Sequence, residues 1–144
     1  MVLRMTEHSP EINSDLTTLA RSTMPFAAEL GISIVEGTPD RVVAVADWRE
    51  ERCTAGGALH GGYLMACVDT VGALNAFLNL PEGAVGTTTI ESKTNFVGAV
   101  RSGQIIITAT PVHAGRTTVV IQTDVTAGDK LVTRSTQTQA VLHG

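Results

Sequence analysis

The sequence predicts an α+β fold in which a strongly curved antiparallel sheet of about six strands wraps around one long central helix. Three observations carry this prediction. Residues 63–78 place apolar side chains on nearly all sides of a helix, which requires burial on nearly all sides. Two strand-like segments precede this helix, and four segments of alternating polarity follow it. The late segments are joined by connectors of a few residues, which favours antiparallel neighbours over a parallel sheet with crossover helices.

The elements are expected in the following order. Residues 1–13 are polar and contain Pro10, so we expect a loosely ordered tail on a single domain that spans 1–144. Asn13, Ser14 and Asp15 offer N-caps for a short helix that breaks at Met24-Pro25-Phe26. Turn chemistry at 37–40 joins the first two strands. The predicted strands are 31–36, 41–48, 87–97, 104–112, 117–125 and 130–142.

Composition narrows the function classes. The 144 residues carry 10 Lys and Arg against 14 Asp and Glu, a net charge of −4, which argues against a duplex-binding surface. Aromatic residues are 3% of the chain, so stacking platforms for single-stranded nucleic acid are not expected. The low charged content, 17%, suggests that part of the surface is buried between subunits. We find no signal peptide, no membrane-spanning run of eighteen apolar residues and no disulfide framework, and expect a cytoplasmic protein.

The sharpest local feature is His60-Gly61-Gly62 at a helix start, followed by Asp69 inside the helix. A helix N-terminus carries unpaired N–H groups and partial positive charge, and glycine lets a substrate oxygen approach them closely. Asp69 is the only charged residue between Arg52 and Glu82. A buried carboxylate without a partner costs several kcal/mol, so such a group is retained for chemistry, pairs across an interface, or is bonded to neutral N–H or hydroxyl donors.

The segment HGGYLMACVDT at 60–70 resembles the hot-dog-fold acyl-CoA thioesterases, in particular the phenylacetate-degradation type. In that family a catalytic Asp follows the His of His-Gly-Gly by nine positions, as Asp69 follows His60. The segments 88–100, 113–117 and 129–142 are similar to the family in order and spacing, and the resemblance covers roughly residues 25–142. It implies a thioester hydrolase that is a homodimer or homotetramer, binds acyl-CoA, and requires no metal or other cofactor.

The resemblance also implies roles for individual residues. The Gly61 N–H would polarise the thioester carbonyl, Asp69 of the neighbouring subunit would act as nucleophile or general base, and His60 would orient the site. Thr88 would contact the attacking water or the carboxylate. The residues implied to bind the substrate are Gly62 and, in the coenzyme A contact turn, Gly115, Arg116 and Thr117.

Two positions qualify the resemblance. Relatives often carry Asn or Gln six positions before the His, where this chain has Thr54, whose single hydroxyl is shorter. Either Thr54 positions water with a different geometry, or the rate or substrate preference differs. Ala73 lacks the hydroxyl of the Glu-type relatives, which favours the Asp-type branch.

Two other functions remain open from the sequence. A non-enzymatic acyl-CoA-binding or sensing protein could use the same cleft, and a hydratase or dehydratase could share the fold. The acyl group is also open, although Phe26, Leu30, Met65, Val68 and Phe96 predict an apolar lining. A metal site is not expected, because His8, His113 and His143 stand outside ligand-like spacings.

Overall fold

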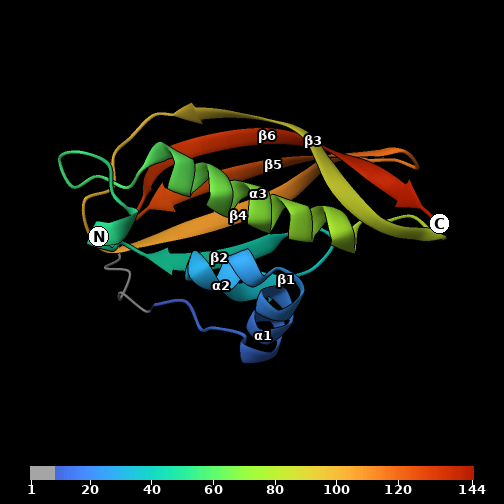
Figure 1. Ribbon diagram of the computed structural model, residues 1–144, viewed down its shortest axis with the longest axis horizontal. Helices are drawn as coiled ribbons and strands as arrows, with labels where there is room; N and C mark the ends of the chain where they lie inside the picture. Colours follow the sequence, from blue (N-terminus) through green and yellow to red (C-terminus); the bar gives the residue numbers. More distant parts are fainter. Residues whose placement is uncertain (1–8) are drawn as a thin grey trace, which may run out of the picture.

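The computed structural model describes residues 9–144 and confirms the predicted architecture. A six-stranded antiparallel sheet in the order β1-β2-β4-β5-β6-β3 curves around the central helix α3. Figure 1 shows α3, in green, lying along the sheet. The elements are α1 Ser14–Thr23, α2 Pro25–Glu29, β1 Ser33–Gly37, β2 Val42–Asp47, a 3₁₀ turn Glu50–Arg52, α3 Gly61–Leu78, β3 Ala84–Phe96, β4 Gln104–Ala114, β5 Thr118–Ala127 and β6 Lys130–His143.

Helix α3 begins at Gly61, two residues earlier than predicted, because His60 serves as its N-cap. The helix has the length and apolarity of a membrane-spanning segment, but here it packs against strands β2 to β6 as a core helix. The side chains of α3 pack against those of the central strands β4 and β5, and these strand side chains are fully buried. The main members of this core are Leu64, Cys67, Val68 and Val71 of α3, Ile105 and Ile107 of β4, and Val119, Ile121 and Val125 of β5.

Helix α1 closes one edge of the sheet. Asn13 caps α1 by accepting a hydrogen bond from the Leu16 N–H at 3.0 Å, as the sequence predicts. The Asn13 N–H donates to the Ile34 carbonyl at 2.8 Å, and the Ile34 N–H donates to the Thr17 hydroxyl at 2.8 Å. Because these contacts satisfy the outer backbone groups of β1, that edge is covered by α1 (Figure 1). Pro25, predicted only to break α1, also starts α2. Of the predicted tail, residues 1–8 lie outside the described residues.

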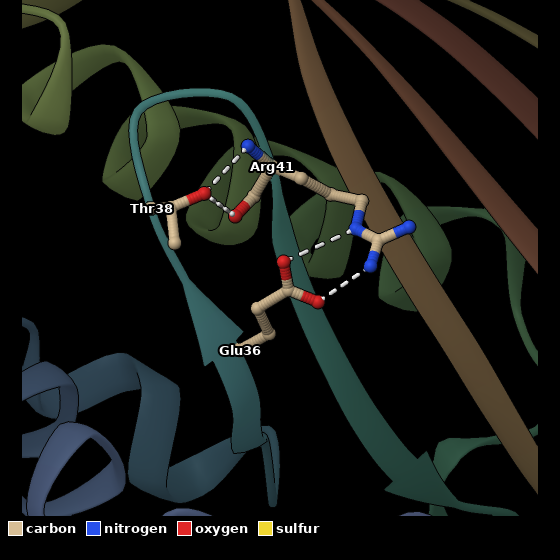
Figure 2. Close-up of polar contacts among 3 residues, drawn as sticks. All are labelled: Glu36, Thr38 and Arg41. Carbon is tan, nitrogen blue, oxygen red and sulfur yellow. Dashed lines mark hydrogen bonds and ion pairs between the residues drawn. The ribbon is translucent and has the colours of Figure 1, made fainter.

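Side-chain hydrogen bonds stabilise the turn between β1 and β2. Figure 2 shows the Thr38 hydroxyl accepting from the Arg41 N–H, while the Arg41 guanidinium makes two contacts with the Glu36 carboxylate, at 3.3 and 2.7 Å. Because this pair is exposed and screened by solvent, it sets the geometry of the hairpin more than its stability.

Candidate active site

Two backbone donors at the start of α3, the N–H groups of Gly61 and Tyr63, meet no acceptor within residues 9–144. The His60 side chain accepts a hydrogen bond from the Gly62 N–H through Nδ1 at 2.8 Å, so the neutral ring carries its proton on Nε2. The Gly61 N–H therefore lies at the positive end of the helix, free to bind an incoming oxygen.

Phe96 covers one side of Gly61. A Cβ added at Gly61 would lie 3.3 Å from the Phe96 ring carbon Cζ, and the ring itself is about half exposed, at 48%. A side chain at position 61 would press on this ring, so a larger residue would displace Phe96 or the start of α3. Glycine is thus the residue that fits beside Phe96 at the helix start.

Asp69 lies on the face of α3 that looks toward β3 and β6. Its Oδ1 atom accepts hydrogen bonds from the Thr89 hydroxyl at 2.8 Å and from the Gln137 side-chain amide at 3.3 Å. No Lys or Arg pairs with this carboxylate in the described part of the chain. Within one chain, Asp69 is therefore a partly exposed carboxylate held by neutral donors.

Two buried glutamines extend this contact into a network. The Gln139 amide donates to the Thr89 hydroxyl at 2.6 Å, and its carbonyl accepts from the Thr87 hydroxyl at 2.7 Å. Gln137 packs against α3 at Gly72, where an added Cβ would lie 2.5 Å from its Oε1 atom. Both glutamines are fully buried. The orientation of the Asp69 carboxylate is consequently set by the strand side chains beneath it.

The hydroxyl next to Asp69 within the chain is that of Thr89. The resemblance implied that Thr88 contacts the attacking water or the carboxylate; Thr88 makes no hydrogen bond to Asp69 of its own chain, and its contact with water stays a prediction. Thr87 and Thr89 both face α3, so Thr88, between them, projects from the opposite face of β3 and is exposed. A β-bulge at Ile90 then shifts the alternation, so that Ser92 also faces the helix.

A cavity of about 290 Å³ opens beside Asp69. It is lined by Phe26, Met65, Ala66, Asp69, Thr70, Thr89 and Ser92. Phe26 and Met65 were predicted for the lining, whereas Leu30 and Val68 are buried core residues and Phe96 lies at Gly61 instead. The pocket thus joins apolar surface to one carboxylate and three hydroxyl residues.

The remaining predicted residues are divided between the two ends of the molecule. Thr54 is exposed in the loop that leads into α3, at the same end as His60 and Gly61. Gly115, Arg116 and Thr117 form the turn between β4 and β5, which lies beside the end of β6, where the His143 ring meets the Arg116 carbonyl at 3.0 Å. Figure 1 shows this turn at the end of the sheet where α3 terminates. One chain therefore does not bring these residues to Gly61.

Gly61 and Asp69 are also apart within one chain. Eight residues of α-helix separate them, which corresponds to roughly 12 Å along the axis at 1.5 Å per residue. A single carbonyl group cannot contact both positions. The two groups can act together only if one of them comes from a second chain.

Cys67 does not serve as a nucleophile. Burial raises the pKa of its thiol to about 12, so almost no thiolate exists near neutral pH. We expect iodoacetamide at pH 7 to modify the partly exposed Cys53 and to spare Cys67, which should become reactive only as the pH approaches 12. Mass spectrometry of the native protein, with a denatured sample as control, checks this. Modification of Cys67 in the native fold at pH 7 would contradict it.

Metal ligands are also absent from this neighbourhood. Among residues 9–144, no three His, Cys, Asp or Glu side chains gather where they could hold a metal ion. The chemically competent groups at the site are the Gly61 N–H, the His60 ring, and the Asp69 carboxylate with its hydroxyl and amide donors.

Comparison with known proteins identifies the family. The family model of the thioesterase superfamily matches residues 56–133. The candidate esterase Rv1847 of Mycobacterium tuberculosis is 33% identical over 96 residues, 65% of this chain and 69% of that protein. The thioesterase HI1161 of Haemophilus influenzae has a similar structure, with a TM-score of 0.81, 29% identity, and coverage of 96% of this chain and 93% of that one.

A second solved structure contains a ligand. A hypothetical thioesterase of Streptococcus pneumoniae, solved with coenzyme A, has a TM-score of 0.75 and 25% identity, and the match covers 85% of this chain and 97% of that one. Together with the six-stranded sheet around α3, these matches establish the hot-dog fold. The chain belongs to the thioesterase superfamily and is a thioester hydrolase.

Proposed function

We propose that the protein hydrolyses small or medium acyl- or aryl-CoA thioesters to the free acid and coenzyme A, as an Asp-type member of the phenylacetate-degradation group. The observation that carries the proposal is the pairing of a free Gly61 N–H at a helix start with an Asp69 carboxylate that only neutral groups hold. A donor aimed at a developing oxyanion is worth about 2.7–4 kcal/mol in measured cases. The carboxylate supplies the base or nucleophile that such a site needs.

The site requires a homodimer. Strand β3 is the open edge of the sheet, thirteen residues long, whereas α1 covers the β1 edge. An edge strand of this length, with exposed Val85, Ile90 and Phe96, is suited to pairing with another chain. Antiparallel pairing of two β3 strands about a two-fold axis would run the two α3 helices in opposite directions. That arrangement carries Gly61 of one subunit toward Asp69 of the other, and pairs of dimers would form the expected homotetramer.

The proposed reaction uses groups of the chain itself. The thioester carbonyl oxygen accepts the Gly61 N–H of one subunit, and His60 helps to orient the thioester. Asp69 of the other subunit either attacks the carbonyl carbon, giving an anhydride that water then cleaves, or takes a proton from the attacking water. In both routes the C–S bond breaks, coenzyme A leaves as a thiolate, and water supplies the new oxygen of the acid.

Coenzyme A recognition is assigned to two regions. Arg116 is exposed in the β4–β5 turn, where its guanidinium can pair with a phosphate, and Gly115 allows close backbone approach. Thr117 and Gly62 complete the proposed substrate contacts, while Thr54 is placed to bind water at the α3 start. The coenzyme A complex of the Streptococcus pneumoniae relative supports binding of this ligand in the fold.

The direct test is incubation of the purified protein with a panel of acyl-CoA thioesters and a chromogenic thiol reagent. Release of free thiol at a rate proportional to enzyme supports the proposal. Binding of acyl-CoA without thiol release would instead identify an acyl-CoA-binding protein. Loss of enoyl-CoA absorbance without thiol release would identify a hydratase.

Thr89 and Thr88 provide a matched pair of variants for the Asp69 environment. Thr89→Val keeps the side-chain shape but removes the 2.8 Å hydrogen bond to Asp69, so we expect kcat to fall at least about tenfold, since a hydrogen bond to a charged group is worth about 1.5–3 kcal/mol. Thr88→Val, on the other face of β3, should leave kcat within about twofold. The opposite ranking of the two variants would show that the predicted Thr88 is the functional hydroxyl.

A further inference from the structure

A second cavity lies farther along the same helix. Its volume is about 400 Å³, and it lies between α1, the C-terminal half of α3 and the start of β3. The walls are chiefly apolar side chains, including Leu19 and Met24 from α1 and its C-cap, and Leu74 and Phe77 from α3. Leu19 and Phe77 are more than half exposed, at 55% and 56%, so the cavity opens to the surface.

The side-chain donors of this cavity are already used within the protein. Two hydroxyl groups line it, those of Thr23 and Thr87. The Thr23 hydroxyl donates to the Leu19 carbonyl of its own helix at 2.9 Å, and the Thr87 hydroxyl donates to Gln139 at 2.7 Å. The amide carbonyls of a group such as pantetheine would lose their hydrogen bonds to water here without meeting a free side-chain donor, which is costly. An alkyl chain loses nothing and buries its surface favourably.

This cavity lies along the same contact between α3 and β3 that contains Asp69. Ala73, in its wall, follows Asp69 by one turn of α3, which is roughly 6 Å along the axis. Thr87, also in the wall, lies two residues before Thr89 on the same face of β3. A substrate whose carbonyl lies beside Asp69 can therefore extend its acyl group along α3 into this space.

We propose that this cavity binds the acyl chain, so that linear medium-chain acyl-CoA thioesters are the preferred substrate class. The inference rests on the proposed function, because it assigns the substrate of the same site. At roughly 30 Å³ per heavy atom, the volume holds on the order of a dozen such atoms. Each buried methylene should raise kcat/KM about three- to fourfold until the cavity is full.

Ala73 offers a way to fill the cavity from its own wall. It lines the cavity on α3, and leucine is a strong helix former, so Ala73→Leu should fold and shorten the available space by several carbons. Ala28→Leu is the matched control, because it is the same substitution at a residue that is exposed on α2 and lines neither cavity.

Two measurements on the full-length protein and both variants test the assignment. The first is kcat/KM for butanoyl-, octanoyl- and dodecanoyl-CoA, and the second is calorimetric binding of the matching S-alkyl thioethers of coenzyme A, which cannot be hydrolysed. Thermal melting confirms folding. In Ala73→Leu we expect octanoyl- and dodecanoyl-CoA to lose at least tenfold in kcat/KM and butanoyl-CoA to lose less than threefold, with the Ala28→Leu profile equal to wild type.

The outcomes separate this inference from the proposed function. Hydrolysis by wild type with an unchanged chain-length profile in Ala73→Leu overturns the cavity assignment and leaves the thioesterase proposal intact. No hydrolysis by wild type, with thioether binding that tightens with chain length and weakens in Ala73→Leu, overturns the enzymatic proposal and supports the cavity. Thioether binding that does not depend on chain length overturns the assignment in either case.

Discussion

Asp69→Asn is expected to lower kcat for acyl-CoA hydrolysis by about 10²–10⁴-fold, the usual contribution of a positioned general base. The amide cannot take a proton from water and is a poor nucleophile. Its oxygen can still accept from the Thr89 hydroxyl and the Gln137 amide, so the local structure should persist. Free thiol release measured at saturating substrate gives the change in kcat.

Thermal melting and binding of an S-alkyl coenzyme A thioether are the controls for this variant. Both should match wild type, because Asn and Asp have nearly the same size and the carboxylate is partly exposed. Turnover equal to wild type in a correctly folded Asp69→Asn protein would remove Asp69 from the mechanism.

The second large effect is expected when two inactive variants, Gly61→Val and Asp69→Asn, share one dimer. Gly61→Val should be inactive, because its side chain would press on Phe96 and displace that ring or the start of α3, where the free N–H lies. Mixing it with Asp69→Asn under conditions that exchange subunits should restore activity. In a two-fold dimer, half of the molecules become mixed, and one of their two sites then has an intact glycine and an intact aspartate. Recovery of about a quarter of the wild-type activity is expected.

Each inactive variant incubated alone under the same exchange conditions is the control, and size-exclusion chromatography confirms that dimers re-form. A mixture that stays inactive although mixed dimers are present would show that Gly61 and Asp69 act within one chain. That result would conflict with their separation of roughly 12 Å along α3.

The fold was predictable because its elements have strong local signals. An apolar helix at 63–78 and strands separated by short turns leave few arrangements that bury the helix. The sheet order was not predicted: short connectors favour β3 beside β4, whereas β3 pairs with β6 and β2 pairs with β4. The helix boundary was less accurate. A run of two glycines is a poor helix signal, and the cap that starts α3 depends on the His60 ring folding back onto Gly62.

The residues that surround Asp69 could not be predicted from the hydropathy pattern. Ser135, Gln137 and Gln139 alternate with Arg134, Thr136 and Thr138 on β6, so both faces of that strand are polar in sequence. Hydropathy alternation therefore gives no means of choosing the buried face. Two glutamines spaced by two residues within a strand were the available signal, but only tertiary contacts with Gly72 and Asp69 identify them as buried.

Strand β3 carries two irregularities in its pairing with β6, one between Ala84 and Gly86 and one between Thr89 and Glu91. Between them Thr87 and Thr89 face the helix; after the second, Ser92 and Thr94 do, and both contact Ser135. If Ile90 were accommodated in a regular strand, Glu91 and Lys93 would face α3 in place of Ser92 and Thr94. Deleting Ile90 would instead restore regular pairing and leave Thr89, Ser92 and Thr94 facing the helix. In an alignment of proteins of this fold, a strand without the bulge therefore keeps these hydroxyl positions only where it is one residue shorter at position 90.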